Sequence, residues 1–441
     1  MKIKWVNHAS YILEHKNIKL ITDPWLFGSA FDGGWDLLIE SKFTISDFQN
    51  ITHIWFSHEH ADHFAPWVLS KIPEEVRKKI TVLFHETLDK RVLNFCKNLS
   101  FKTIELENKK KYTLADDFSI ICGRMLSIDS WLFCEVNGLS ILNLNDCVVK
   151  NYGLSRPIKK ITGDVDILLT QFSYANWVGN PEEKKFRKFF ALEVLNRVKF
   201  QIEVFNPTYT IPFASFVYFS HEENKYLNDS VNTIEGTCEF ITDNTDSKPI
   251  VLYPGDCWDG FSKYPNQTSL AKYKKDYVSI LNQTYTKPST PLGDDELIVK
   301  AEKYLQNIKN KNSVLAMNLL RLLPSYRNIV IKFMDTGEYC KFDWHNGIYF
   351  FSNLDNRQYD VELSTNSLKY IFQFEWGLST ILINGRCRMP HKENRKFKNI
   401  FIFGLLNSEG KRLSVRTLLN MFLSKVLGKH ITLIIRTLKG M

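Results

Sequence analysis

Three histidines and one aspartate lie within six residues of the chain. They are His58, His60, Asp62 and His63, and they follow the apolar segment 51–56. Neutral imidazole and carboxylate groups are ligands that zinc, iron and manganese accept. Because side chains at i and i+2 of an extended chain point the same way, His58 and His60 can bind one ion, while Asp62 and His63 can face a second. The spacing therefore predicts a site for one or two divalent metal ions.

A metal ion held by these residues with one open coordination position would activate water. Coordination lowers the pKa of the bound water to about 7, which provides a metal-bound hydroxide as a nucleophile at neutral pH. The predicted chemistry is therefore hydrolytic, with Asp62 as the catalytic residue that orients the water and accepts its proton. Zinc is favoured as the metal, with iron and manganese as alternatives.

The segments around this cluster alternate between strand and helix patterns. Two short apolar runs, 10–13 and 19–22, flank a polar turn and predict a β-hairpin. Further strands are expected at 141–145 and 213–219, and an amphipathic helix at 184–198. The chain is therefore expected to fold as a mixed α/β protein whose polar side chains gather at strand ends.

The sequence SHEHADHF at residues 57–64 resembles the HxHxDH signature of the metallo-β-lactamase superfamily. The N-terminal run VNHASYILEHKNIKLITDPWL is similar to the opening hairpin of that fold. The phrases NLNDC and PFASFVYFSHEENKY are most similar to the branch of the CMP-sialic acid hydroxylases, with the ascorbate-phosphate lactonases as more distant relatives. The resemblance covers roughly residues 3–260. It implies an αββα sandwich, in which two mixed sheets pack between outer helices.

The same resemblance assigns two further metal ligands. Asp146 matches the carboxylate that bridges the two metals, and His221 matches the last histidine ligand. The superfamily usually has another histidine near residues 123–127, and none is present here. Asp129 is a candidate oxygen ligand in its place, with a solvated turn aspartate as the alternative. If no residue replaces that histidine, the first metal site is one protein ligand short, whereas the second metal site keeps its full set of ligands.

Three more polar residues are candidates for supporting roles. Asp23, which precedes a proline, is expected to support the metal loop through a hydrogen bond to a histidine. Lys225 and Tyr226, four and five residues after His221, are candidate contacts for an anionic substrate. The eight cysteines include no CxxC pair and none of the Cys-x-His and Cys-x-x-His pairs of a Rieske domain, which the sialic acid hydroxylases carry.

The composition is that of an ordinary globular chain. With 44% hydrophobic and 24% charged residues in 441, disorder and fibrous folds are excluded.

A stretch rich in Thr and Pro divides the predicted metal-binding domain, residues 1–285, from a smaller α+β accessory domain, residues 294–441. A net charge of +9 is too mild for the basic surface of a nucleic-acid-binding protein. The absence of a secretion signal and of a spanning segment predicts a cytoplasmic location.

The C-terminal residues 411–439 combine basic and apolar side chains without an acidic residue. Their spacing predicts a final helix that packs on the accessory domain, or alternatively a weak peripheral contact with a membrane surface.

The leading interpretation is a metal-dependent hydrolase acting on a small anionic ester, amide or phosphoester, such as a sugar nucleotide or another cell-envelope precursor. The second is an iron-dependent oxygenase resembling CMP-sialic acid hydroxylase, which would need an external electron donor. The third is a degenerate, non-enzymatic protein that binds a metal or a ligand, and the missing histidine keeps it open.

Overall fold

The computed structural model describes residues 1–125, 128–282, 290–351, 359–390 and 394–419. The chain forms two compact units. Unit 1 comprises Met1–Pro288 together with Ile383–Gly385, and unit 2 comprises Ser289–Leu382 and Arg386–Met441.

The first sheet of unit 1 has seven strands in the order β16-β1-β2-β3-β5-β6-β7. The antiparallel pair β2 and β3 confirms the predicted hairpin. From β3 to β7 the strands are parallel, so their carboxyl ends meet at one edge. The bounds are β1 (Lys2–Asn7), β2 (Ser10–His15), β3 (Ile18–Thr22), β5 (His53–Trp55), β6 (Thr81–His85), β7 (Lys102–Leu106) and β16 (Cys257–Trp258).

The second sheet has seven strands in the order β15-β13-β12-β11-β10-β9-β8. Strands β11, β12 and β13 are parallel, which brings the end of β11, just before Asp146, to the same edge as the end of β12. The bounds are β8 (Lys111–Ala115), β9 (Phe118–Arg124), β10 (Ser130–Val136), β11 (Leu139–Asn145), β12 (Ile167–Gln171), β13 (Tyr209–Phe213) and β15 (Lys248–Pro249).

The single strand predicted at 213–219 is wrong, because two strands share this segment. β13 ends at Phe213, and β14 (Val217–Phe219) pairs with β4 (Trp35–Leu37) in a separate two-stranded sheet. The break lies at Ala214, whose φ of 48° is incompatible with an extended strand. Its amide donates to the carbonyl of His8 instead of continuing a strand ladder (3.0 Å).

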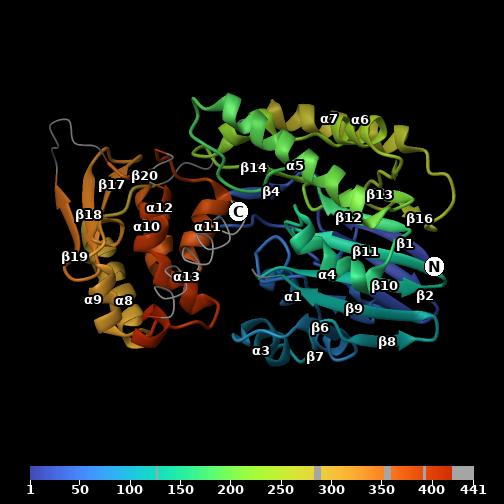
Figure 1. Cartoon of the computed structure of the whole chain (residues 1–441), viewed down its shortest axis with the longest axis horizontal. Coiled ribbons are helices and arrows are strands. Elements are labelled where there is room, and N and C mark those ends of the chain that lie inside the picture. The colour runs from blue at the N-terminus through green and yellow to red at the C-terminus, as the bar shows by residue number, and fades with distance from the viewer. Residues whose placement is uncertain (126–127, 283–289, 352–358, 391–393, 420–441) are drawn as a thin grey trace, which may run out of the picture. The chain divides into compact units, whose positions relative to one another are not determined.

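Helices cover the outer faces of both sheets, as Figure 1 shows. α3 contacts β6 and β7 of the first sheet, and α5 and α6 contact β12 and β13 of the second. α5 continues past the predicted 184–198 to Phe205. The bounds are η1 (Ile45–Asn50), α1 (Pro66–Leu69), α2 (Glu74–Arg77), α3 (Arg91–Asn98), α4 (Tyr152–Thr162), α5 (Lys184–Phe205), η2 (Lys225–Ser230), α6 (Ile234–Asn244) and α7 (Asn266–Leu281).

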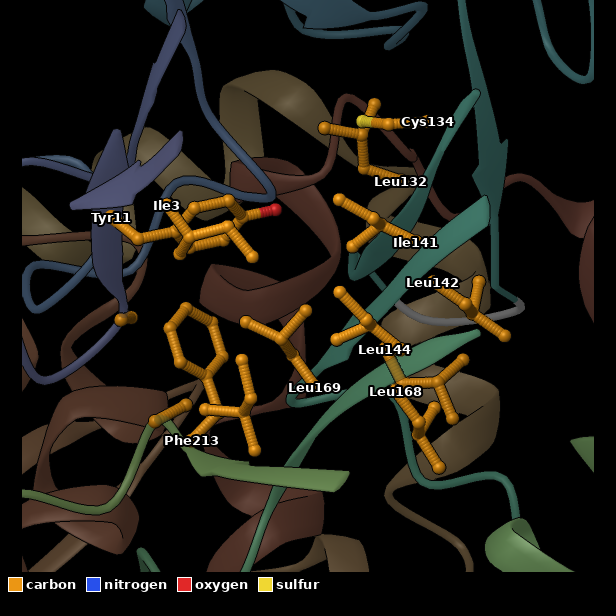
Figure 2. Close-up of a cluster of buried hydrophobic side chains, with 14 of the residues drawn as sticks. Ile3, Tyr11, Leu132, Cys134, Ile141, Leu142, Leu144, Leu168, Leu169 and Phe213 are labelled. Carbon is orange, nitrogen blue, oxygen red and sulfur yellow. The ribbon is translucent and has the colours of Figure 1, made fainter. Parts of the chain in front are cut away.

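A hydrophobic core lies between the two sheets of unit 1. Figure 2 shows Ile3 and Tyr11 of the first sheet facing Leu144, Leu169 and Phe213 of the second. Each of these side chains is at most 1% exposed, and burial of one such side chain contributes roughly 1.5–3 kcal/mol. Helices outside and two facing sheets inside confirm the predicted αββα sandwich.

Unit 2 is an α+β structure around a four-stranded sheet in the order β19-β18-β17-β20. No helix in the described part of either unit is long and apolar enough to cross a bilayer. The bounds in this part of the chain are α8 (Asp294–Lys311), α9 (Val314–Leu320), η3 (Pro324–Tyr326), β17 (Ile329–Phe333), β18 (Tyr339–Asp343), β19 (Gly347–Phe351), β20 (Val361–Leu363), α10 (Thr365–Gln373), α11 (Gly377–Asn384), α12 (Asn394–Ile400) and α13 (Ile402–Ser408). The predicted basic tail lies outside the described residues from position 420 onward.

Candidate metal centre

The HxHxDH segment forms a tight loop directly after β5. The backbone amides of His63 and Phe64 both donate to the carbonyl of His60, at 3.0 and 2.7 Å. This turn folds the loop back on itself. As a result His58 and His63, five positions apart, have ring centroids only 4.2 Å apart.

Two groups of three potential ligands meet at this loop. One consists of His8, Asp62 and His63, and the other of His58, His63 and Asp146; within each group the ligand atoms lie within 4.8 Å of one another. His63 Nε2 lies 3.2 Å from Asp62 Oδ2 and 3.4 Å from Asp146 Oδ2. The imidazole of His63 therefore joins the two groups.

Two more predicted side chains lie beside His58. Its Nε2 is 2.9 Å from Nδ1 of His60 and 3.9 Å from Oδ1 of Asp129. The side chain of Asp129 is only 17% exposed. Neither of the two ligand groups in the described residues contains Asp129, so its role as an oxygen ligand stays a prediction.

A buried carboxylate orients the histidines from behind. Asp23 accepts hydrogen bonds from the Ser57 amide (2.8 Å), the Ser57 hydroxyl (2.7 Å), Asn145 Nδ2 (2.6 Å) and His63 Nδ1 (2.9 Å). The predicted hydrogen bond from Asp23 to a histidine is thus present. Because Nδ1 of His63 donates to Asp23, Nε2 is the ring nitrogen that faces the other ligands.

Ser57 fixes His58 in the same way. The Ser57 hydroxyl gives its only proton to Asp23, so it accepts the hydrogen bond that joins it to His58 Nδ1 (3.0 Å). The Nε2 atom of His58 then keeps its lone pair. Both histidines are therefore presented in the tautomer that binds a cation through Nε2.

The donor atoms of the centre fit a divalent cation. Within the described part of the chain, Asp62 Oδ1 and His63 Nε2 are buried without a hydrogen-bond partner. An unsatisfied buried polar atom lowers the stability of the fold by about 1–3 kcal/mol, so such atoms are rare in native structures. A metal ion bound by both atoms would satisfy them.

The electrostatics of the site agree with metal coordination. Burial, with the nearby charge of His63, lowers the pKa of His58 to about 4, and burial beside His58 lowers the pKa of His60 to about 4. Both imidazoles are therefore neutral at pH 7, as metal ligands must be. Burial also opposes a charge on His63, but the carboxylates of Asp62 and Asp146 outweigh it and raise the pKa of His63 well above its ordinary value. Without a metal ion His63 is therefore protonated at pH 7, and a bound cation would have to displace its Nε2 proton.

The structure does not bring every predicted residue into this cluster. Neither of the two ligand groups in the described residues contains His221, whose Nδ1 accepts the amide of Glu223 at 3.2 Å. Lys225 pairs with Glu222 at 2.6 Å, and the hydroxyl of Tyr226 donates to the carbonyl of Gly179 at 3.1 Å.

Sequence reasoning gave His8 no role. It lies in the turn between β1 and β2, is 1% exposed, and its Nε2 is 3.2 Å from Asp62 Oδ2. The available signal was its position directly after the apolar strand β1. β1 pairs with β2, and β2 pairs with β3, which leads to Asp23.

Residues 2–186 match the family model described as the β-lactamase superfamily domain. Unit 1 therefore contains a metallo-β-lactamase superfamily domain. The cytidine monophosphate-N-acetylneuraminic acid hydroxylase of Xenopus laevis is 26% identical over 253 residues, which cover 52% of this chain and 40% of that protein. The inactive human protein of the same name is 26% identical over 304 residues, which cover 59% of this chain and 60% of that protein. The predicted superfamily and its hydroxylase-like branch are confirmed, and the chain spans 40–60% of the length of these two relatives.

Solved structures of two enzymes are also similar to this chain. CmlA, a diiron β-hydroxylase from Streptomyces venezuelae, is 14% identical with a TM-score of 0.42 and covers 58% of this chain and 53% of its own. Isothiocyanate hydrolase from Delia radicum gut bacteria is 14% identical with a TM-score of 0.41 and covers 60% of this chain and 100% of its own.

Proposed function

We propose that this protein is a metal-dependent hydrolase of small anionic esters, amides or phosphoesters. The observation that carries the proposal is the convergence of His58, His63 and Asp146 with the unpartnered, buried Asp62 Oδ1 on one edge of the sandwich. In this proposal His58, His60 and Asp129 hold one ion, Asp62 and His63 hold the other, and Asp146 is shared. His221 stays the last ligand predicted from the family resemblance.

Bound ions would polarise a substrate oxygen and lower the pKa of a coordinated water. Asp62 would orient that water. Burial raises the pKa of Asp62, but the charge of His63 and the hydrogen bond from His8 lower it well below its ordinary value. A carboxylate with so low a pKa stays ionised at neutral pH, so Asp62 is better suited to orienting the water than to retaining its proton.

The net charge of the chain and the names of its relatives support an anionic substrate. The chain has 57 basic and 48 acidic residues, and a net positive charge raises the local concentration of anions. The names of the curated relatives specify an anionic sugar nucleotide, cytidine monophosphate-N-acetylneuraminic acid. A sugar nucleotide or a similar cell-envelope precursor is therefore the substrate class to test first.

An iron-dependent oxygenase is the second candidate, and one feature of the site favours it. Asp129 places a carboxylate beside His58 where an imidazole is usual in the superfamily, and oxygen-rich ligand sets suit iron and manganese. The curated relatives are named as hydroxylases. Because the sequence contains no Rieske cysteine–histidine pairs, this reaction would need an external electron donor.

Elemental analysis of protein purified without added metal, followed by turnover assays, tests these candidates. The proposed hydrolase should contain zinc or manganese and cleave phosphodiester or ester substrates without oxygen. A chelator, or the Asp146→Ala substitution, should abolish that cleavage. Bound iron with oxygen-dependent turnover would favour the oxygenase. Protein that retains no metal would contradict both and leave a non-enzymatic binding protein.

A further inference from the structure

Two polar side chains behind Asp146 form a chain of hydrogen bonds that the proposed reaction does not use. Gln171, the last residue of β12, donates from Nε2 to Asp146 Oδ1 at 2.9 Å. Arg197, on α5, donates from Nη2 to Gln171 Oε1 at 2.9 Å and lies 3.4 Å from the Gln171 carbonyl. α5 packs on β12 in the sandwich, so both partners come from rigid elements (Figure 1).

The chemistry of the three groups gives this chain of bonds a single direction. A guanidinium can only donate and an ionised carboxylate can only accept, whereas an amide does both. Arg197 therefore holds the oxygen of the Gln171 amide, which leaves the amide nitrogen facing Asp146. Without Arg197 the amide could rotate by 180° and turn its oxygen toward the Asp146 carboxylate.

The charge of Arg197 acts toward Asp146. Burial lowers the pKa of Arg197, and the charge of Asp146 opposes this effect. Among the residues that the structure describes, the Nε of Arg197 is buried without a hydrogen-bond partner. Burying a cation without a paired anion is costly, and packing alone would be served as well by an apolar side chain. The described hydrogen bonds of its guanidinium both lead to Gln171, which touches the carboxylate predicted to bridge the metals.

We propose that Arg197 and Gln171 are positioning residues that hold Asp146 by Oδ1, so that its Oδ2 faces the metal cluster. The inference rests on the proposed function, because it assigns the orientation of one proposed ligand. It explains why Oδ2, and not Oδ1, is the Asp146 atom that lies 3.4 Å from His63 Nε2. Asp146 Oδ1 is thereby held by Gln171, and Oδ2 is the oxygen left to face His63.

Metal affinity measured by competition with a chromophoric chelator tests the proposal without an activity assay. Gln171→Leu removes the donor to Asp146, and Arg197→Met frees the amide to rotate. Each should weaken the binding of zinc or cobalt by about 10–100-fold, the usual effect of losing a partner of a metal ligand. Arg197→Lys keeps a donor and should restore part of the affinity.

The double variant distinguishes a relay from two separate contributions. If Arg197 acts mainly through Gln171, then Arg197→Met should cause a much smaller loss in Gln171→Leu than in wild type, since the amide that it orients is gone and only its charge still acts on Asp146. Multiplied losses would contradict the relay.

Gln201→Leu is the matched control. Gln201 lies one turn further along α5 and is fully buried, with hydrogen bonds to Thr170 and Val149 and none to Asp146. Its replacement should lower the denaturation midpoint of the metal-free protein but leave metal affinity unchanged. Equal loss of affinity in this control would mean that general destabilisation is the cause, and would overturn the proposal.

Failure of the inference and failure of the proposed function give different results. Wild-type protein that binds metal, with Gln171→Leu and Arg197→Met variants within twofold of it, would overturn the positioning role alone. Wild-type protein that binds no divalent metal would overturn both.

Discussion

Replacing Asp23 by Ala should both destabilise unit 1 and weaken metal binding, because one buried carboxylate holds the metal loop from behind. Asp23 is 1% exposed and is the acceptor for the Ser57 amide and hydroxyl, the Asn145 amide group and His63 Nδ1. The Ala variant leaves all of these donors without their acceptor. It also removes the negative charge beside His63.

The size of the stability loss follows from the four donors that lose their acceptor. Each unsatisfied buried donor costs about 1–3 kcal/mol, so the four together set an upper limit of roughly 4–12 kcal/mol. The Ser57 hydroxyl can rotate, and water can enter the space left by the carboxylate, so the realised loss should be smaller. We expect about 3–5 kcal/mol, the range measured when one partner of a buried charged pair is removed.

Urea denaturation of the metal-free protein measures the first effect and chelator competition the second. Because His63 loses the acceptor that fixes its tautomer, metal affinity should fall by about 10–100-fold. Asp256→Ala is the matched control. Its carboxylate also accepts several hydrogen bonds, from the Tyr253 amide and from the hydroxyls of Tyr264 and Ser269.

The control should lose stability without losing metal affinity, since no described contact joins Asp256 to the metal loop. The reasoning would be refuted if Asp23→Ala unfolded within about 1 kcal/mol of wild type and bound metal equally tightly. It would also be refuted if both variants lost metal affinity to the same extent.

Three further predictions concern single features of the chain. Metal titration should show two unequal equivalents, and Asp129→Ala should weaken only one of them; two equivalents unaffected by this substitution would exclude Asp129 as a ligand. Burial lowers the pKa of His85 to about 4, so the unfolded chain takes up its proton first as the pH falls. The free energy of unfolding should therefore decrease by up to about 3 kcal/mol between pH 6.5 and pH 4, and urea denaturation of His85→Leu should show this part of the pH dependence removed. If the basic tail at residues 411–439 contacts membranes, sedimentation with anionic vesicles at low salt should detect binding that is lost when the chain is cut after Leu405, whereas binding that survives this truncation, or no binding at low salt, would leave the tail only a packing role.

The sequence predicted the centre of the site because its main signal is local. His58, His60, Asp62 and His63 lie so close along the chain that almost any loop after a strand brings them together. Asp146 was assigned from the family resemblance, and its place after an apolar strand agreed with that assignment because α/β folds gather polar residues at strand ends.

The features that the sequence did not predict depend on contacts between distant segments. His8 reaches Asp62 across 54 positions, and Arg197 reaches Gln171 across 26. Neither residue carries a local pattern that distinguishes it from a core histidine or a surface arginine. The break between β13 and β14 was missed for a different reason, because an alanine with positive φ gives no turn signal of the kind that glycine or asparagine gives.

Unit 1 contains a short segment from late in the chain, Ile383–Gly385, and this affects how the protein is made. Asn384 donates from Nδ2 to the Phe31 carbonyl (2.9 Å), and its own carbonyl accepts from Asn224 Nδ2 (2.7 Å). Asn224 in turn caps the loop that begins at His221, by accepting the His221 amide (2.9 Å). A ribosome that has finished residue 288 has therefore not yet supplied every part of unit 1. At about 5–20 residues per second, the missing asparagine follows roughly 5–20 s later. During this interval the side chain of Asn224 and the carbonyl of Phe31 are without the hydrogen bonds that Asn384 provides.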